Sequence, residues 1–215
     1  ICMGWSSRFR WAKLDPLIIA ILLLWHAGES LRVRPHYLTY FNQFAGGADG
    51  GHRYFVDSSL DWGQGLPELH TWLQKNHHDE PLYLSSFGSD DPQRFPINAT
   101  RIGDLYFDFS NRQILPELKA GTYCISATML HRVYTQVRGP WSREYENAFH
   151  QVAKIIATTQ ASPEQLQTFA QLRFGRLCHY LKNRAPDIRV EPTFFIYLLN
   201  EEEIGRALYA PWESL

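Results

Sequence analysis

The chain has 215 residues, of which 45% are hydrophobic and 20% charged, and its 21 Lys and Arg nearly balance its 22 Asp and Glu. This much apolar and aromatic material argues against intrinsic disorder, because it can bury enough surface to offset the lost chain entropy. The near-neutral charge excludes a nucleic-acid partner bound through a basic surplus. A mean hydropathy of -0.32 argues against a polytopic membrane protein.

The first predicted element is an apolar helix around residues 17–25, which read Leu-Ile-Ile-Ala-Ile-Leu-Leu-Leu-Trp. This run alone is too short to cross a bilayer, which takes about 20 helical residues. A wider window reaches that length only by including charged side chains. Three interpretations stay open: a secretory signal peptide, a buried core helix, and the last, partly polar transmembrane helix of a larger protein. We favour the third, because the segment that follows Trp25 makes a poor cleavage site.

This choice divides the chain into two parts. Residues 1–34 form a terminal membrane-helix segment, and residues 35–215 form an extracytoplasmic domain. The basic residues that precede the apolar run place its N-terminal side in the cytoplasm; they are Arg8, Arg10 and Lys13. We therefore expect the protein in the cell inner membrane, with everything after about residue 35 on the periplasmic side.

The middle of the chain alternates between strand and helix patterns. Residues 52–56 form a short strand candidate, and apolar residues at helical spacing over 66–73 predict a helix that starts near Pro67. Residues 82–87 and 121–127 are two further apolar strand candidates. The stretch between them is punctuated by proline and is expected to consist of loops and short elements.

The last third is predicted to be helical and then extended. Residues 145–156 form one amphipathic helix, and a capping box from Ser162 to Gln165 opens another that ends before Pro186. Residues 193–199 form a buried strand, and 201–209 a terminal helix. The strand–helix alternation predicts a three-layer α/β domain with a mainly parallel sheet, preceded by one N-terminal transmembrane helix.

Several other features point to structure rather than chemistry. The three cysteines have no metal-type spacing, so Cys124 and Cys178 are expected in the core, with a disulfide between them as the alternative. The glycine-rich residues 46–51 lack the Lys and Ser/Thr of a phosphate-binding loop and indicate a flexible turn. Residues 77–80 read His-His-Asp-Glu and indicate an exposed turn, with a metal site as the weaker alternative. No cofactor and no metal are expected.

The densest polar cluster lies at residues 57–65, directly after the first predicted strand. Ligands of open parallel sheets bind at the carboxyl ends of the strands. Carboxylates, hydroxyls, an amide and an indole at such an edge suit a sugar, because a Trp ring covers the apolar side of a pyranose. The alternative is structural, since Asp and Ser after a strand often cap the next helix. The candidate substrate-binding residues are Asp57, Ser59, Asp61, Trp62 and Gln64.

Two blocks of the sequence resemble a known family. Residues 34–47 read R-P-H-Y-L-T-Y-F-N-Q-F-A-G-G, and residues 56–64 read V-D-S-S-L-D-W-G-Q. Together they resemble the C-terminal region of bacterial phospholipid-carrier-dependent membrane glycosyltransferases, relatives of the dolichyl-phosphate-mannose-protein mannosyltransferases. Shorter pieces at 86–88, 125–130 and 139–141 agree, so the resemblance spans roughly residues 20 to 200. The chain departs from the family pattern at Gln43, Ser59 and Gly65, where that pattern has an acidic residue, Asn and Asp.

The resemblance implies a multi-spanning enzyme that transfers a sugar from a polyprenyl-phosphate carrier on the outer face of the membrane. In such enzymes the acidic catalytic residue lies in an early extracytoplasmic loop, which this chain lacks, so no catalytic residue is carried over. The expected partners are the lipid-linked sugar donor, the membrane and the membrane core of the full-length enzyme.

Two other functions are weighed against this one. The first is a non-catalytic binding or scaffold module that packs on a membrane protein, with a wholly structural polar cluster. The second is an independent hydrolase, which is disfavoured because the Gly-x-Ser-x-Gly nucleophile motif is absent.

Overall fold

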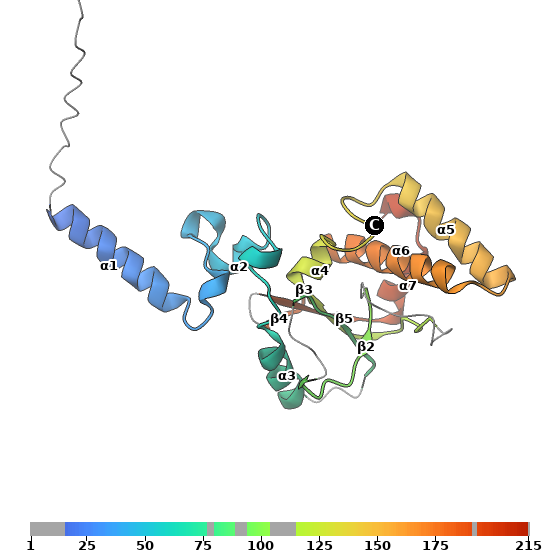
Figure 1. The fold of residues 1–215 in the computed structure, drawn as a ribbon, viewed down its shortest axis with the longest axis horizontal. Helices are drawn as coiled ribbons and strands as arrows, with labels where there is room; N and C mark the ends of the chain where they lie inside the picture. The colour runs from blue at the N-terminus through green and yellow to red at the C-terminus, as the bar shows by residue number, and fades with distance from the viewer. Residues whose placement is uncertain (1–15, 77–79, 89–93, 104–114, 191–192, 215) are drawn as a thin grey trace, which may run out of the picture.

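The computed structural model describes residues 16–76, 80–88, 94–103, 115–190 and 193–214. A helix projects from an α/β body in which five strands form a single sheet (Figure 1). The helices are α1 (Pro16–Arg32), α2 (Gly47–Gly51), α3 (Leu66–Lys75), α4 (Ala127–His131), α5 (Arg143–Thr158), α6 (Pro163–Lys182) and α7 (Glu201–Tyr209). The strands are β1 (Leu82–Ser85), β2 (Thr100–Arg101), β3 (Gly121–Ser126), β4 (Ile188–Val190) and β5 (Phe194–Leu199). Short 3-10 turns lie at Tyr37–Thr39, Gln43–Ala45, Asp57–Ser59 and Trp212–Ser214.

The sheet has the strand order β2-β1-β3-β5-β4 and is mixed. β1 pairs in parallel with β2 and β3, whereas β5 pairs antiparallel with both β3 and β4. Four of the five strands therefore run in one direction and only β5 opposes them, which confirms a mainly parallel sheet. The reversal at β5 follows from its short connection to β4, since paired strands separated by only three residues of sequence cannot run parallel.

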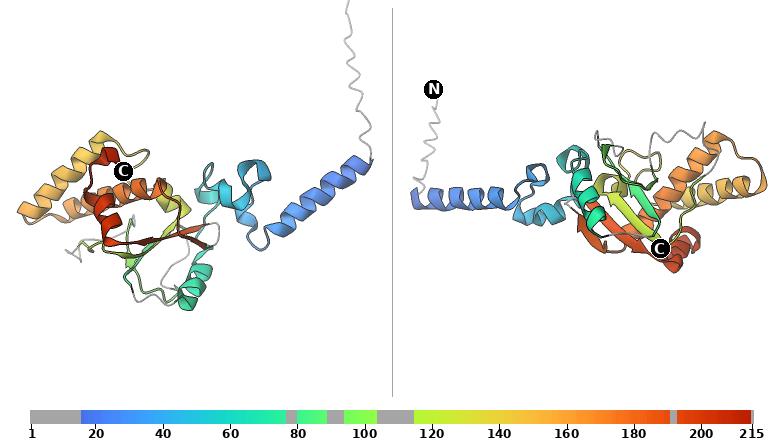
Figure 2. Two further views of the ribbon diagram at one scale, coloured as in Figure 1. Left: turned by 180° about the vertical axis from the view of Figure 1, so that it is seen from behind. Right: turned by 90° about the horizontal axis from the view of Figure 1, so that it is seen from below.

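Both faces of the sheet are covered, because successive strand residues point to opposite sides. On one face, Tyr123 and Ile125 of β3 and Phe195 of β5 pack in a cluster with Leu130, Phe174 and Leu177 of α4 and α6. On the other face, Cys124 and Ile196 pack with Leu66 and Leu69 of α3. Figure 2 shows the helices on the two sides of the sheet from behind and from below.

The C-terminal predictions are confirmed, and capping explains where these helices begin. Ser162 and Asn200 each accept a bond from the backbone N–H three residues on, while Gln165 and Glu203 reach back to the cap residue. α5 begins after Ser142, whose side chain accepts from the Tyr145 N–H. α6 ends at Lys182, short of Pro186.

Two local predictions are wrong. Residues 52–56 form no strand: His52 to Tyr54 lie in turns, and Val56 is extended without a partner strand. Its side chain instead packs on the same cluster as Phe41, so the apolar pattern reflects packing rather than sheet pairing. The glycine-rich residues 46–51 contain the short helix α2, which follows Gly46 at φ 82°, a left-handed conformation that glycine adopts without steric cost.

The cysteine prediction is confirmed in its first form. Cys124 and Cys178 are both buried and both free, and they lie in the clusters on opposite faces of the sheet. Burial raises the pKa of each thiol to about 12, so neither is a reactive thiolate at neutral pH.

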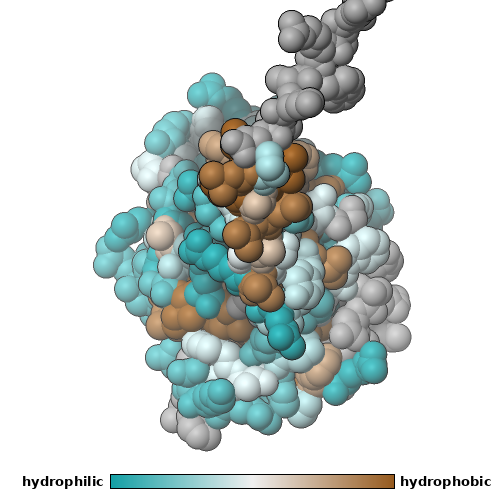
Figure 3. All heavy atoms as spheres, turned by 90° about the vertical axis from the view of Figure 1, so that its left-hand side faces the viewer, coloured by the Kyte–Doolittle hydropathy of each residue, from teal (hydrophilic) through white to brown (hydrophobic). Residues whose placement is uncertain are grey.

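The helix α1 stands apart from the body. It begins at Pro16, a favoured first position, and has no buried residue, so its large apolar side chains are exposed. In the view of Figure 3 the hydrophobic residues gather over this projecting element, while the surface around it is mostly hydrophilic. Within residues 16–214 as described, no helix combines the length and apolar character needed to cross a membrane. Arg8, Arg10 and Lys13 lie outside the described residues.

Candidate functional site

The predicted polar cluster lies at the carboxyl end of β3, although no strand leads into it. The backbone N–H of Asp57 donates to the Thr128 hydroxyl, 2.9 Å away in α4, the helix that directly follows β3. The segment then passes through the turn at Asp57–Ser59 and reaches α3. The cluster therefore occupies the edge where parallel sheets bind ligands. It is placed there by the bond to Thr128 after β3 and not, as expected, by a strand that precedes it.

Asp57 anchors the turn by its backbone and its side chain. Its φ of 62° is in the left-handed region, which Asp tolerates better than most residues. Its carbonyl accepts from the N–H groups of Leu60 and Asp61, at 2.8 and 2.7 Å. Its carboxylate Oδ2 accepts a 2.5 Å bond from the hydroxyl of Tyr134, which raises the pKa of that tyrosine.

Asp61 is fully buried beneath the turn. Its Oδ1 accepts from the Gly63 N–H at 3.1 Å, while Oδ2 is buried with no hydrogen-bond partner of ordinary geometry among the described residues. Burial raises the pKa of Asp61 to about 6, against the opposing effects of the Gly63 N–H and the nearby hydroxyls of Ser126 and Thr128. The carboxyl can therefore hold a proton near neutral pH, but it has no surface to offer a ligand.

The other three predicted residues divide between structure and surface. The Gln64 amide is used within the turn: its Oε1 accepts from the Trp62 N–H at 2.7 Å and its Nε2 donates to the Leu60 carbonyl at 2.8 Å. Trp62 leaves 49% of its surface exposed, and Ser59 is also exposed. Of the five predicted residues only Asp61 is fully buried: Trp62 and Ser59 are exposed, and Asp57 and Gln64 are half-buried, with the Gln64 amide already engaged in the turn.

Two aromatic residues that sequence reasoning did not assign to the site complete this surface. Tyr134 stacks on Phe87 with ring centroids 5.0 Å apart, and Phe87 donates its N–H to the Ser126 hydroxyl. The next residue, Gly88, lies so close to the Trp62 backbone that a Cβ would approach it to 2.2 Å. We call Asp57, Trp62, Phe87 and Tyr134 the aromatic edge.

The aromatic edge combines ring faces with a carboxylate, which is the chemistry that binds sugar hydroxyls and the apolar face of a pyranose. Phe87 lies in the piece at residues 86–88 that resembles the family, and this resemblance could have assigned it to the site. No sequence signal assigned Tyr134 to the site, because it lies 77 residues from Asp57 and follows a helix that was not predicted.

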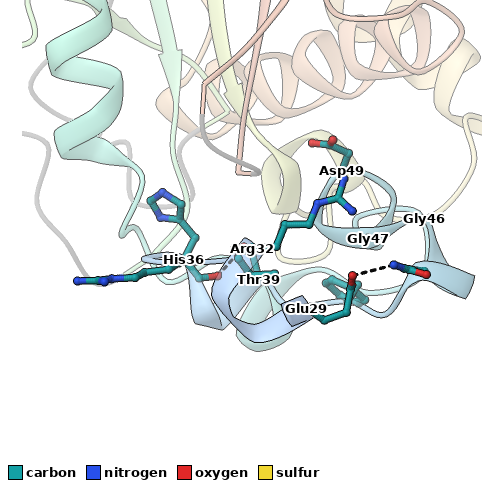
Figure 4. A pocket seen from close by; sticks show the side chains of 11 residues that line it. Glu29, Arg32, His36, Thr39, Gly46, Gly47 and Asp49 are labelled. Atoms are coloured by element: carbon teal, nitrogen blue, oxygen red, sulfur yellow. Dashed lines mark hydrogen bonds between the residues drawn. The ribbon is translucent and has the colours of Figure 1, made fainter. Parts of the chain in front are cut away.

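A cavity of about 480 Å³ lies between the end of α1 and residues 34–49, the region of the first resembling block. Figure 4 shows Glu29 and Arg32 of α1 and His36, Thr39 and Asp49 of the following segment around it. Gln43 closes one side, since its Nε2 donates to Glu29 Oε1 at 2.7 Å. The lining of this cavity carries charges of both signs, so the cavity favours neither anions nor cations.

Metal-ligating residues do not converge in the part of the chain that the structure describes, where no group of three His, Cys, Asp or Glu could hold an ion. His77, His78 and Asp79 of the weaker metal alternative lie outside the described residues.

Comparison with known proteins identifies no family: no family model, no curated protein and no solved structure matches the chain.

Proposed function

We propose that this chain is the extracytoplasmic α/β domain of a membrane glycosyltransferase that transfers a sugar from a polyprenyl-phosphate carrier, with the catalytic acid supplied from outside this chain. The supporting observation is that the two resembling blocks, 34–47 and 56–64, pack against the same core cluster. Phe41 of the first stacks on Phe55, next to the second, with ring centroids 6.3 Å apart, and Phe41 and Val56 pack on one core cluster.

The helix α1 supports a membrane location for this domain. Exposed apolar surface on this scale marks contact with a membrane or a partner, and no described residue of α1 is buried by the body. We assign it to the membrane core of the full-length enzyme, as a partly polar helix of the inner membrane, with the body on the periplasmic side. The first cavity then lies at the junction of helix and body.

The aromatic edge is the proposed contact with the transferred sugar or its acceptor. Trp62 offers an accessible ring face, and Asp57 an oxygen acceptor already oriented by Tyr134. Asp61 and Gln64 act indirectly, by holding the turn that presents Trp62. Four of the five predicted residues thus have a task at this site, and Ser59 is exposed on the same turn without an assigned task.

A scaffold module remains the second candidate, and a specific observation favours it. The polar groups of Asp61 and Gln64 bond to their own turn, as expected of a structural cluster. In that case the domain holds the membrane helices in place and its aromatic edge contacts no sugar.

The test is Trp62→Ala in the full-length membrane protein, with transfer from a polyprenyl-phosphate sugar measured in proteoliposomes. The matched control is Tyr209→Ala, another exposed aromatic residue that lies on α7, away from the edge. We expect transfer to fall at least about tenfold for Trp62→Ala, given what an aromatic contact contributes, and to stay unchanged for the control. Equal rates for both variants at equal membrane expression would refute the sugar contact and favour the scaffold.

A further inference from the structure

A second cavity, of about 510 Å³, is strongly basic. It lies among α2, α4, the end of α6, β4 and β5, which meet at the same end of the sheet (Figure 1). Its lining includes four permanent cations and two histidines and contains no acidic residue. We call it the basic pocket; its cations and histidines are His52, Arg53, His131, Lys182, Arg184 and Arg189.

The charges of the basic pocket are only partly compensated. Arg184 pairs with Glu203 at 2.7 Å and with Asp187 at 2.5 Å, so its charge is balanced. Arg189 donates to the Asp49 backbone carbonyl at 2.9 Å, a neutral acceptor. Arg53 and Lys182 form no ion pair with any described residue.

Lys182 has an ordinary explanation, because cations stabilise a helix C-terminus, and α6 ends there. Arg189 lies in the edge strand β4, where a charged side chain discourages further strand pairing, and its guanidinium lies over the Phe195 ring, 5.3 Å from the centroid. Arg53 follows α2 in a turn and has no such structural role. Three cations with unneutralised charge thus converge from three separate elements on one hollow.

Burial and, to a smaller extent, the neighbouring cations favour the neutral form of both histidines. The pKa of His52 is lowered by burial and then by Arg189, and the pKa of His131 is lowered to about 4 by burial and then by Lys182. Both rings are therefore neutral at pH 7 and can each donate one N–H. His52 Nδ1 is buried, and the Asp49 backbone lies close enough to the ring to oppose part of the lowering of its pKa.

We infer that the basic pocket binds the phosphate group of a small phosphorylated ligand. Converging cations and N–H donors match a tetrahedral dianion, and Arg offers a planar fork to two of its oxygens. The volume falls within the range of about 300–1,000 Å³ for small-molecule sites. Leu130, Phe195 and Tyr197 give the pocket an apolar wall for the group that carries the phosphate.

Such a phosphate can belong to a soluble molecule or to a lipid headgroup, and the inference does not rest on the proposed glycosyltransferase function. The probes are inorganic pyrophosphate, and phosphatidylcholine vesicles with and without phosphatidic acid. The protein is the full chain at low salt. Basic residues outside the pocket, among them Arg8, Arg10 and Lys13, also attract an anionic vesicle. Only the part of the difference between vesicles that is lost in the pocket variant therefore reports the pocket.

The variant is the double change Arg53→Gln with Lys182→Gln, and the matched control is Arg143→Gln with Lys154→Gln, two exposed cations of α5. Neither pair holds the fold together through a described ion pair, so thermal unfolding should be unchanged in the control and little changed in the pocket variant, which loses the favourable charge of Lys182 at the end of α6. Each single variant is measured as well. We expect the pocket variant to lower pyrophosphate affinity by at least about tenfold, with single variants in between, and the control to leave it unchanged.

The outcomes separate the sources of the phosphate. Pyrophosphate binding without a pocket-dependent preference between vesicles assigns a soluble ligand, and preference for phosphatidic acid that is lost in the pocket variant assigns a lipid headgroup. Binding of neither probe, or an equal loss in the pocket and control variants, overturns the inference.

Discussion

The hydroxyl of Tyr134 donates a 2.5 Å hydrogen bond to the carboxylate of Asp57, across 77 residues of sequence. This bond joins the loop after α4 to the polar turn, while the Asp57 N–H bonds to Thr128 at the start of the same helix. The turn is therefore held by both ends of α4, which explains why its geometry does not need a preceding strand.

The left-handed backbone of Asp57 gives a prediction that separates strain from hydrogen bonding. Asp57→Ala should lower the free energy of unfolding by about 1–2 kcal/mol, because a Cβ without a local hydrogen bond is disfavoured at φ 62°. Asp57→Gly should be less harmful, and Asp57→Asn nearly neutral, since Asn tolerates this conformation and keeps an acceptor for Tyr134. Denaturant unfolding of the three variants checks the order; equal losses for Ala and Gly would contradict it.

Asp61 should make stability depend on pH. Its pKa is raised from 3.8 to about 6 in the folded state, so the folded protein binds the proton more tightly than the unfolded chain. The protonated carboxyl stabilises the fold fully below about pH 4. This stabilisation is lost as the pH rises through about 6, and the free energy of unfolding then falls by up to about 3 kcal/mol in total.

Asp61→Asn isolates this effect, because the other groups titrate in both proteins. As the pH rises from about 4 to about 7, the free energy of unfolding of the variant minus that of the original chain should increase by about 2–3 kcal/mol. Urea unfolding of both proteins at several pH values measures this difference in unfolding free energy. A difference that stays constant over this pH range would contradict the prediction.

The buried ion pair between Glu146 and Arg176 should dominate the attachment of α5 to α6. Arg176 Nε and Nη2 donate to the two carboxylate oxygens at 3.0 and 2.9 Å, and Trp141 donates to Oε2 at 2.8 Å. Burial raises the pKa of Glu146, but the bonds from Arg176 and Trp141 more than offset this and hold it below its ordinary value.

Glu146→Ala should therefore lower the free energy of unfolding by about 3–5 kcal/mol, because it leaves the fully buried Arg176 unpaired. The control is Glu202→Ala, which breaks the exposed pair with Arg206 and should leave stability unchanged. Thermal unfolding compares the two, and similar small losses would show that the buried pair contributes little.

Gly88 and Gly139 form a matched pair for the packing of the aromatic edge. Both have positive φ, 120° and 71°, but a Cβ on Gly88 would meet the Trp62 and Gly63 backbone at 2.2 Å, whereas one on Gly139 meets nothing within 4 Å. Gly139→Ala should cost about 1 kcal/mol from backbone conformation alone.

Gly88→Ala should cost at least about 1 kcal/mol more than Gly139→Ala, because the neighbouring backbone must move. Denaturant unfolding measures the difference. Equal costs would mean that the Trp62 turn yields without strain and that Gly88 does not position it.

The sequence by itself determined the elements whose signals are local. The capping box at Ser162, the apolar strands at 121–126 and 194–199, and the burial of both cysteines follow from short-range pattern and hydrophobicity. It also picked out the polar turn at 57–64, because polar residues of several kinds rarely gather without a structural or functional cause.

Only the tertiary structure decided how those elements pair, pack and form sites. Val56 looked like a strand residue because packing and sheet pairing select the same apolar side chains, and nothing local separates them. The direction of β5, the burial of Asp61, the Tyr134 bond to Asp57 and the basic pocket all depend on contacts between residues far apart in the chain. Such contacts are fixed by how the layers pack, so composition and spacing carry no trace of them.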